Sequence, residues 1–133
     1  MTRLSNTAVI SIVDDDESYR TAMKAMVESF GYVVAAFASG VEFLGSDDLH
    51  DSGCLITDVR MPGMSGFELH HRLIAAGHSI PTIFLTAFPD EKGNDRAMKA
   101  GAVAYLSKLC HRDDLFARIQ AAFNRGTADG RGS

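Results

Sequence analysis

The chain has 133 residues, of which 46% are hydrophobic and 23% are charged, as in soluble globular proteins and unlike disordered chains. A chain of this length can bury one good hydrophobic core and is too short for two well-sized domains. Its formal net charge of −4 at pH 7 gives no general attraction to nucleic acid or anionic lipid, so we expect no direct nucleic-acid binding by this chain and no membrane association.

The N-terminal segment and the cysteines indicate a reducing, cytoplasmic environment. The first apolar run is short and ends in acidic residues, unlike a signal peptide. No apolar run approaches the roughly 18 residues of a membrane-spanning helix. Cys54 and Cys110 have no partner at a metal-binding or redox-active spacing, so we expect two free thiols in a cytoplasmic protein.

Five short stretches rich in apolar and β-branched residues predict five β-strands. In chain order they cover residues 8–13, 32–37, 54–59, 81–88 and 102–107. The first of them, AVISIV, is almost wholly apolar, which is typical of a strand buried on both faces of a sheet.

Amphipathic stretches between and after these strands predict helices. Residues 19–30 place their apolar side chains on one helical stripe. The sequences SGVE at 39–42 and SGFE at 65–68 are capping boxes that open the second and third helices. Glycines that favour helix ends follow the first, fourth and last helices, at Gly31, Gly101 and Gly126.

This alternation of strands and helices predicts a doubly wound α/β fold. Consecutive strands run parallel when right-handed helical crossovers join them, and the helices then cover both faces of the sheet. We predict one domain over residues 1–125. The remaining residues, 126–133, are small, polar and rich in glycine, so we expect a flexible tail or the start of a linker.

Polar residues stand directly at the ends of four predicted strands. Asp14 and Asp15 follow the first strand, Asp58 and Thr86 end the third and fourth, and Lys108 follows the fifth. Because ligands in open α/β sheets bind outside the carboxyl ends of the parallel strands, these distant residues are expected to share one site.

The residue types predict a site for a phosphoryl group on or beside a carboxylate. Several carboxylates in one crevice repel each other unless a cation lies between them. A set of oxygen ligands without His or Cys favours Mg²⁺. Lys108 supplies a positive charge and Thr86 a hydroxyl donor for the oxygens of a carboxylate or phosphoryl group.

Each of these residues taken alone also fits a structural role. An acid after a strand often caps the next helix, and Asp16, Glu17 or Ser18 is expected to do so here. Asp58 alone fits a loop acid, Thr86 a strand hydroxyl bonded to the backbone, and Lys108 a solvated surface lysine. The functional interpretation therefore depends on their joint placement.

Taken together, these residues resemble the receiver domain of bacterial two-component response regulators, over essentially the whole chain. The motifs are the pair Asp14-Asp15, the segment ITDVRMPGMSGFEL around Asp58, Thr86-Ala87, and Lys108. The segments DVRMPGMSG and AMKAGAVAYL are most similar to receivers of the FixJ/LuxR-type subgroup, which precede DNA-binding domains. The resemblance implies a CheY-like fold with the flavodoxin-like strand order 2-1-3-4-5.

The resemblance also implies a phosphorylation site. Asp58 would accept a phosphoryl group from the phosphohistidine of a sensor histidine kinase. Mg²⁺ would be held by Asp15, by Asp58, by Asp14 acting mostly through water, and by the main-chain carbonyl of Arg60. The phosphoryl oxygens would be bound by Thr86, by the main-chain N–H of Ala87 and by Lys108. Such a domain is a signalling phosphoacceptor, not an enzyme, with at most self-phosphorylation from small phosphodonors and slow autodephosphorylation.

For signalling, the family pattern implies that Thr86 moves toward the phosphoryl group while Tyr105 on the fifth strand rotates inward. The alternative is a half-buried Tyr105 whose hydroxyl is in water. Gly93 and Asn94 lie in or near the first turn of the fourth helix, so this turn is expected to be marginally stable, unless the loop is longer and the helix shorter. The face of the fourth helix, fifth strand and fifth helix would control an output domain or partner, with transcription as one output and a phosphorylation-dependent homodimer as one hypothesis.

One residue departs from the family pattern. Receivers usually have a proline, commonly after a cis peptide bond, where this chain has Leu109. A cis bond before a non-proline residue costs about 2.5–4 kcal/mol. We therefore predict that the Lys108–Leu109 bond is either trans, with a rearranged loop, or a strained cis bond.

Two other functions remain open at the sequence level. A haloacid-dehalogenase-like phosphatase would use the D-x-D spacing of Asp14 and Asp16, but that interpretation leaves Asp58 without a role. A receiver-like scaffold that no longer accepts phosphate is the second alternative, and the presence of Leu109 keeps it open.

Overall fold

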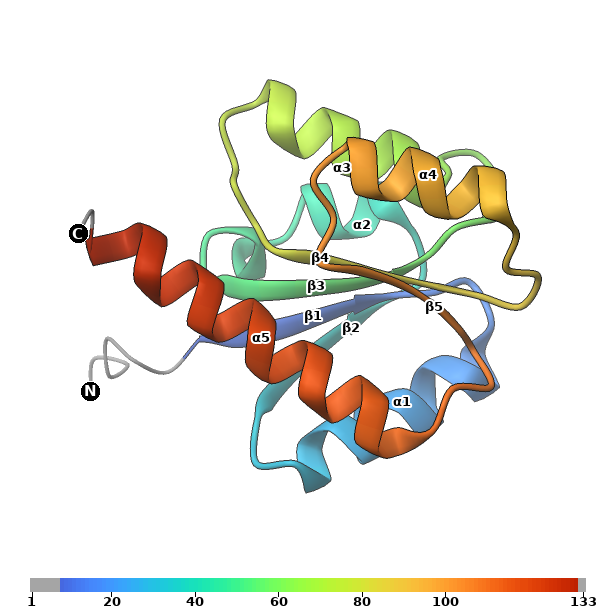
Figure 1. Ribbon diagram of the computed structural model, residues 1–133, viewed down its shortest axis with the longest axis horizontal. Helices are drawn as coiled ribbons and strands as arrows, with labels where there is room; N and C mark the ends of the chain where they lie inside the picture. The colour runs from blue at the N-terminus through green and yellow to red at the C-terminus, as the bar shows by residue number, and fades with distance from the viewer. Residues whose placement is uncertain (1–7, 132–133) are drawn as a thin grey trace.

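The computed structural model describes residues 8–131, with side chains described through residue 124 (Figure 1). A five-stranded parallel sheet forms its centre, in the order β2-β1-β3-β4-β5. The strands are β1 (Val9–Val13), β2 (Val33–Phe37), β3 (Ser52–Asp58), β4 (Thr82–Thr86) and β5 (Ala104–Ser107). The predicted fold class and strand order are both confirmed.

Helices cover both faces of this sheet. They are α1 (Glu17–Ser29), α2 (Gly40–Leu44), α3 (Gly66–Ala75), α4 (Glu91–Lys99) and α5 (Arg112–Arg131), with a short 3-10 helix η1 (Asp47–Leu49) before β3. Figure 1 shows α1 and α5 on one side of the sheet and α2, α3 and α4 on the other. The molecule therefore has three layers, as a doubly wound fold requires.

Two apolar layers hold the helices to the sheet. Between the sheet and α1 and α5, Ile10 and Ile12 of β1 pack with Met23, Val27 and other buried side chains. The opposite face has two smaller clusters, one around Phe43 and one around Phe84. Each fully buried side chain of this size contributes about 1.5–3 kcal/mol relative to an exposed one. All five residues of β1 are buried, as its apolar sequence predicts.

Side-chain caps begin the helices at the predicted positions. The side chain of Asp16 caps α1 by accepting a hydrogen bond from the N–H of Tyr19 at 3.2 Å. Ser39 and Ser65 accept from the N–H groups three residues later, at 3.1 Å in each case. Glu42 of the first predicted capping box accepts a hydrogen bond from the N–H of Ala38, the residue before the cap, whereas Glu68 of the second pairs with Arg72 one helical turn later. Each such cap stabilises its helix by about 1 kcal/mol.

The ends of several elements differ from the sequence-based prediction. β4 stops at Thr86, so that Phe88 lies in the following loop with 71% of its surface exposed. α5 continues through Gly126 to Arg131, past the helix end that the sequence predicts before Gly126. A glycine inside a helix costs about 1 kcal/mol relative to alanine and does not by itself end the helix. Residues 132 and 133 lie outside the described part, and the domain boundary at residue 125 stays a prediction.

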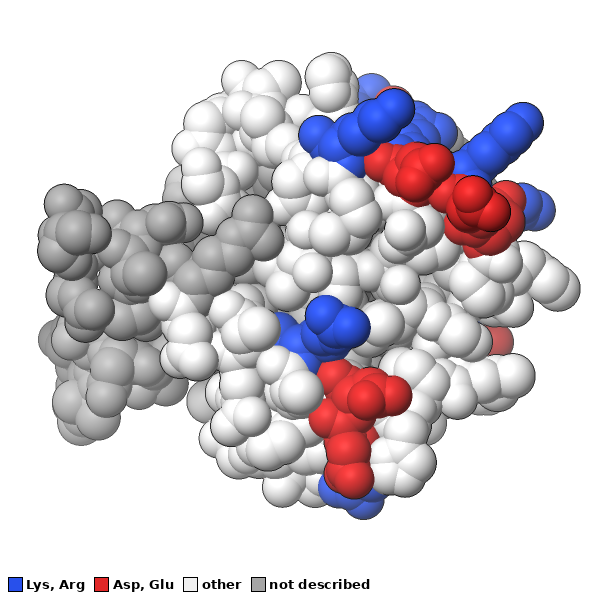
Figure 2. Space-filling view, in the orientation of Figure 1, with Lys and Arg blue, Asp and Glu red and all other residues white. Residues whose placement is uncertain are grey.

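The face shown in Figure 2 carries charges of both signs. Lysine and arginine side chains lie beside aspartate and glutamate side chains over α4 and over the first half of α5 (Figure 2). On α4 the sequence EKGNDRAMK alternates acids and bases within two turns. A one-sign field that would attract a polyanion is therefore not formed over these two helices.

Candidate functional site

The strand register brings the predicted polar residues to one edge of the sheet. Val13 pairs with Thr57, so Asp14 lies beside Asp58, the last residue of β3. Thr86 pairs with Ser107, so Lys108 follows immediately beside the end of β4. Residues that are up to 94 positions apart in the sequence thus meet at the carboxyl ends of four strands, as predicted.

Three carboxylates form a group that could hold a metal ion. One oxygen atom from each of Asp14, Asp15 and Asp58 lies within 4.8 Å of the others. Asp14 and Asp58 are 2% and 8% exposed, whereas Asp15 is open to solvent. Hard oxygen donors at the mouth of a crevice fit Mg²⁺, which usually binds one or two carboxylates and keeps several waters. The neighbouring Asp16 is not in this group because its side chain caps α1.

The acidic loop is held in place by local hydrogen bonds. The N–H of Asp16 donates to Asp14 Oδ1 at 2.9 Å, and Arg20 Nη1 donates to the main-chain oxygen of Asp14 at 2.7 Å. Both contacts fix Asp14 against the first turn of α1. The phosphatase interpretation needs Asp14 and Asp16 to act together at one site, and the capping role of Asp16 argues against it.

Lys108 bridges the two buried carboxylates. Its Nζ atom is 2.8 Å from Asp14 Oδ2 and 3.1 Å from Asp58 Oδ2. The contact with Asp58 was predicted, but the shorter one with Asp14 was not. Burial alone would lower the pKa of Lys108, yet hydrogen bonds from its ammonium to Asp14 and Asp58 outweigh burial and raise the pKa. Lys108 therefore supplies a positive charge that offsets the repulsion between these acids.

Asp58 is a buried carboxylate that is only partly compensated. Its Oδ1 accepts a hydrogen bond from the N–H of Val59 at 2.7 Å, and its Oδ2 accepts one from Lys108. Burial raises the pKa of Asp58, and Asp14 adds to this effect, whereas Lys108 and the Val59 N–H oppose it. The net pKa is above the usual value for an aspartate.

Gly66 allows the helix that follows this loop to approach Asp58 closely. A Cβ atom at position 66 would overlap the main-chain oxygen of Asp58, and the N–H of Gly66 donates to the main-chain oxygen of Val59 at 2.8 Å. In the sequence, Gly66 is recognisable only as part of a capping box. A requirement for glycine that comes from a contact distant in space leaves no local pattern in the sequence.

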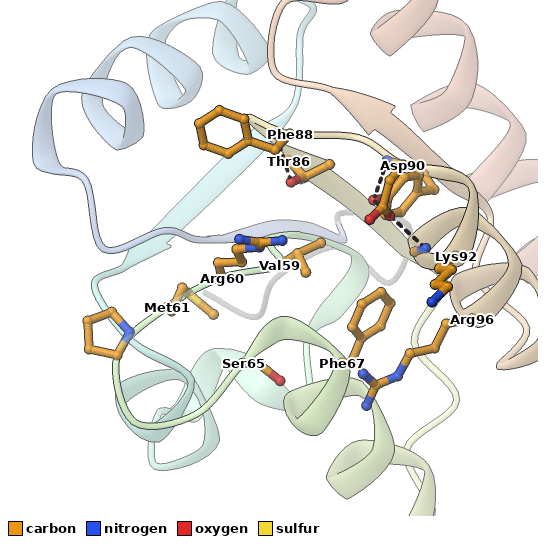
Figure 3. A pocket seen from close by; sticks show the side chains of 13 residues that line it. Val59, Arg60, Met61, Ser65, Phe67, Thr86, Phe88, Asp90, Lys92 and Arg96 are labelled. Atoms are coloured by element: carbon orange, nitrogen blue, oxygen red, sulfur yellow. Dashed lines mark hydrogen bonds between the residues drawn. The ribbon is translucent and has the colours of Figure 1, made fainter.

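Thr86 is buried at the end of β4, with 2% of its surface exposed. Its Oγ1 accepts a hydrogen bond from the N–H of Phe88 at 3.2 Å, so the structural role of a hydroxyl bonded to backbone is realised here. Ala87 lies between them in the same loop. Thr86 and Arg60 both line a cavity of about 650 Å³ that extends from the site toward α4 (Figure 3).

Tyr105 of β5 lines this cavity near the start of α4. Its hydroxyl accepts a hydrogen bond from the N–H of Asp90 at 3.2 Å and donates one to Asp90 Oδ1 at 3.3 Å. Asp90 also caps α4 by accepting from the N–H of Gly93 at 2.8 Å. The hydroxyl is thus bonded to the start of α4, unlike the alternative in which only water binds it. Gly93 and Asn94 do lie in the first turn of α4, as predicted.

The Lys108–Leu109 peptide bond is trans, like every peptide bond among the described residues. The loop is held by its backbone, since the N–H of Lys108 donates to Thr86 O at 2.9 Å and the N–H of Leu109 donates to Ser107 Oγ at 3.0 Å. Leu109 is 91% exposed and contributes no packing that would fix the loop. The first of the two predicted arrangements, a trans bond, is therefore the one observed.

Cys54 and Cys110 are free thiols, as predicted, and burial raises the pKa of Cys54 to about 12. Among the described residues, every helix is too short or too polar to cross a bilayer.

The strand order and the acidic site at the strand ends define a flavodoxin-like α/β domain, and comparison with known proteins specifies its family. The chain belongs to the response regulator receiver domain family, which matches residues 10–120. The chain is thus a receiver domain of a two-component system, as the motifs predicted.

Individual relatives agree with this assignment. Over 115 residues the chain is 39% identical to the response regulator protein TmoT of Ectopseudomonas mendocina, covering 86% of this chain and 52% of that protein. It is 35% identical over 122 residues to the transcriptional regulatory protein FixJ of Azorhizobium caulinodans, covering 92% of this chain and 58% of the relative. The chain therefore spans about half the length of the curated relatives it matches.

Solved structures show the same relationship. The crystal structure of FixJ-N superposes with a TM-score of 0.79 at 32% identity, covering 88% of this chain and 94% of that one. The structure of the response regulator StyR gives a TM-score of 0.86 at 35% identity, covering 95% of this chain and 64% of that one.

Proposed function

We propose that this receiver domain accepts a phosphoryl group on Asp58 from a sensor histidine kinase, with Mg²⁺ as cofactor. The observation that carries the proposal is the convergence of three carboxylates and one lysine. One oxygen from each acid lies within 4.8 Å of the others, and Lys108 touches two of the acids. Phosphoryl transfer needs mainly positioning and charge neutralisation, which this set of residues offers.

In the proposed reaction a carboxylate oxygen of Asp58 attacks the phosphorus of a phosphohistidine. A P–O bond forms to Asp58, the P–N bond breaks, and the electron pair leaves with the imidazole. Asp14, Asp15, Asp58 and the main-chain carbonyl of Arg60 would hold Mg²⁺, directly or through water, and the ion would neutralise phosphoryl oxygens. Lys108, the Thr86 hydroxyl and the N–H of Ala87 would bind the remaining phosphoryl oxygens.

Phosphorylation would then be transmitted through Thr86 and Tyr105 to the face formed by α4, β5 and α5. The bond of Tyr105 to Asp90 supports this proposal, because it links β5 directly to the first turn of α4. In this proposal the face controls an output domain or another protein in the cytoplasm. The output is transcription if the protein acts like FixJ. Phosphorylation would also promote homodimerisation. It assigns the chain no enzymatic role beyond slow loss of its own phosphoryl group.

Radiolabelled acetyl phosphate with Mg²⁺ tests the proposal directly. We expect stable labelling of the wild-type protein and none in Asp58→Asn. Asp15→Asn should reduce labelling by at least about 10-fold, because changing even a residue that supports a metal ligand costs about 10-fold to 100-fold. Asp16→Asn is the matched control, because the adjacent acid caps α1 and asparagine caps a helix as well as aspartate.

The same assay discriminates the two other functions. Labelling that survives in Asp58→Asn and disappears only in Asp14→Asn would support the phosphatase and contradict our proposal. No labelling of the wild type, together with no Mg²⁺-dependent change in tyrosine fluorescence, would contradict our proposal and support the receiver-like scaffold that no longer accepts phosphate. Size measurement with and without beryllofluoride separately tests dimerisation, and a monomer in both conditions would reject it.

A further inference from the structure

The side chain of Lys108 must be fixed by contacts at its tip. Its own backbone belongs to a short turn, and the next residue, Leu109, is 91% exposed. A lysine side chain has four rotatable bonds and loses up to about 2 kcal/mol of rotamer entropy when it is held in one position. What restrains the ammonium group is therefore the set of groups around Nζ.

Three groups surround Nζ, and the third is an aromatic ring. Two are the carboxylates of Asp14 and Asp58. The third is Tyr19, whose ring lies under the ammonium with 4.5 Å between Nζ and the ring centroid. This distance is well within the range of about 6 Å over which a cation is attracted to an aromatic face. An ammonium group has three N–H donors, so the two carboxylates leave one for the ring face.

The ring is placed there by the start of α1. Tyr19 lies in the first turn of α1, and its N–H donates to the capping side chain of Asp16. Its side chain is half-buried against the core cluster between the sheet and α1 and α5. The same cap that removes Asp16 from the acidic group thus orients Tyr19 toward Lys108.

We propose that Tyr19 is a positioning residue that holds the Lys108 ammonium at the phosphoacceptor carboxylate through its ring face. The inference depends on the proposed function for its consequence, though the contact itself does not. In that function the carboxylates of Asp14 and Asp58 would also hold Mg²⁺, so the ion would compete with Lys108 for these two acids. The ring takes no part in that competition and keeps the ammonium beside Asp58 when the acids are engaged elsewhere.

The alternative is that the Tyr19 side chain only packs in the core and has no effect on Lys108. Two substitutions separate these roles, because Tyr19→Phe keeps the ring and Tyr19→Leu keeps an apolar side chain without a ring. Phe30→Leu is the matched control: it removes an aromatic residue at the C-cap of α1 that packs on the same core cluster and lies below Arg112 at 5.4 Å, not below Lys108.

The first measurement needs neither phosphate nor metal. A ring face shields the protons that lie above it, so the ε-methylene signals of Lys108 should appear upfield in NMR spectra of the wild type. We expect these signals to stay upfield in Tyr19→Phe and Phe30→Leu and to return to ordinary lysine values in Tyr19→Leu. Unchanged signals in Tyr19→Leu would overturn the proposed contact.

The second measurement is the rate of phosphorylation at subsaturating acetyl phosphate. Loss of a cation–π contact should slow Tyr19→Leu by about 3-fold to about 10-fold, while Tyr19→Phe and Phe30→Leu stay within about 2-fold of wild type. A shifted signal with an unchanged rate would overturn the positioning role. If the wild type takes up no phosphoryl group, the function proposed for Asp58 fails, and the NMR signals alone decide on the contact. Tyr19→Met replaces Tyr19→Leu if the latter does not fold.

Discussion

Asp58 is a single residue at which folding stability and the proposed chemistry conflict, because the proposed nucleophile is an ionised carboxylate and burial disfavours the ionised form. It is 8% exposed, and burial raises its pKa against the opposing effect of Lys108. The folded state favours the protonated carboxyl of Asp58. The stability that the protonated form contributes is fully present below 3.8, the ordinary pKa in the unfolded chain, and is lost as the pH rises through the raised pKa of the folded state. At neutral pH, the ionised Asp58 therefore lowers the free energy of unfolding.

Asp58→Asn should for this reason be more stable than the wild type at pH 7 in the absence of metal. Asparagine has the same shape without the charge, and Lys108 keeps its contact with Asp14. Thermal unfolding in EDTA from pH 7 downward should show a higher Tm for the variant at pH 7 and a gap that closes toward pH 3.8. Asp16→Asn should show no such gap, and a lower Tm of Asp58→Asn at pH 7 would contradict the argument.

The sequence predicted which residues would meet at this site but not how they would touch. Asp14, Asp58 and Lys108 could be placed together because parallel strand ends share one edge of the sheet. The bond from Lys108 to Asp14 and the ring of Tyr19 below it depend on rotamers and on the angle at which α1 leaves the sheet. Neither leaves a periodic signal in the sequence.

At the scale of elements, the junction between β5 and α4 is a tightly packed contact near the site. A Cβ atom at Gly93 would overlap the hydroxyl of Tyr105 and come within 2.7 Å of Asp90 Oδ1. Gly93 therefore provides room for the tyrosine, even though glycine in a helix costs about 1 kcal/mol relative to alanine. The first turn of α4 is therefore intrinsically less stable than an alanine-containing turn, and the glycine allows Tyr105 of β5 to contact it.

A double-mutant cycle tests this coupling between Gly93 and Tyr105. Gly93→Ala should destabilise the wild type because its methyl group displaces Tyr105 from Asp90. In a Tyr105→Ala background the overlap with the hydroxyl is removed and only the approach to Asp90 Oδ1 remains, so the same substitution should be about 0.5–3 kcal/mol less destabilising, as expected for residues in contact. Urea unfolding of the four proteins gives the coupling energy. Additive effects of the two substitutions would show that Tyr105 moves aside without cost.

Element ends were harder to predict than element identities. The apolar Phe88 extends the pattern of β4, yet the strand ends at Thr86 and the phenyl ring is 71% exposed. A local pattern cannot distinguish an apolar strand residue from an apolar loop residue, because a strand ends where the neighbouring strand no longer pairs with it. Here the last pair joins Thr86 to Ser107. Likewise Gly126 is a favourable place to end α5, but the helix continues to Arg131.

At the scale of the whole molecule, the proposed Mg²⁺ site would couple metal binding to folding. Three carboxylates gathered at the sheet edge repel each other, and Lys108 relieves part of this repulsion. A ligand that binds only the folded state stabilises it by about 2.7 kcal/mol at a concentration 100 times its Kd. Mg²⁺ should therefore raise the Tm of the wild type.

Lys108→Met should strengthen this effect of Mg²⁺ even though it removes a proposed phosphoryl contact. Without the ammonium group, Asp14 and Asp58 are more repulsive and lose a competitor for the metal, so the Kd for Mg²⁺ should fall by about 3-fold or more. Titration followed by tyrosine fluorescence or calorimetry measures this. Lys24→Met is the matched control, since Lys24 is exposed and pairs with Glu28 on α1. A weaker affinity in Lys108→Met would mean that Lys108 supports the metal instead of competing with it.

The burial of Cys54 in β3 has a consequence for observing these transitions. Its thiol is fully covered at the centre of the sheet, and its pKa of about 12 leaves almost no thiolate at neutral pH. An alkylating reagent can reach it only when the sheet separates, whereas Cys110 in the loop after β5 is partly open. The two cysteines thus report on different events in one molecule: alkylation of Cys54 measures how often the whole domain opens, and alkylation of Cys110 measures the movement of the loop beside Lys108.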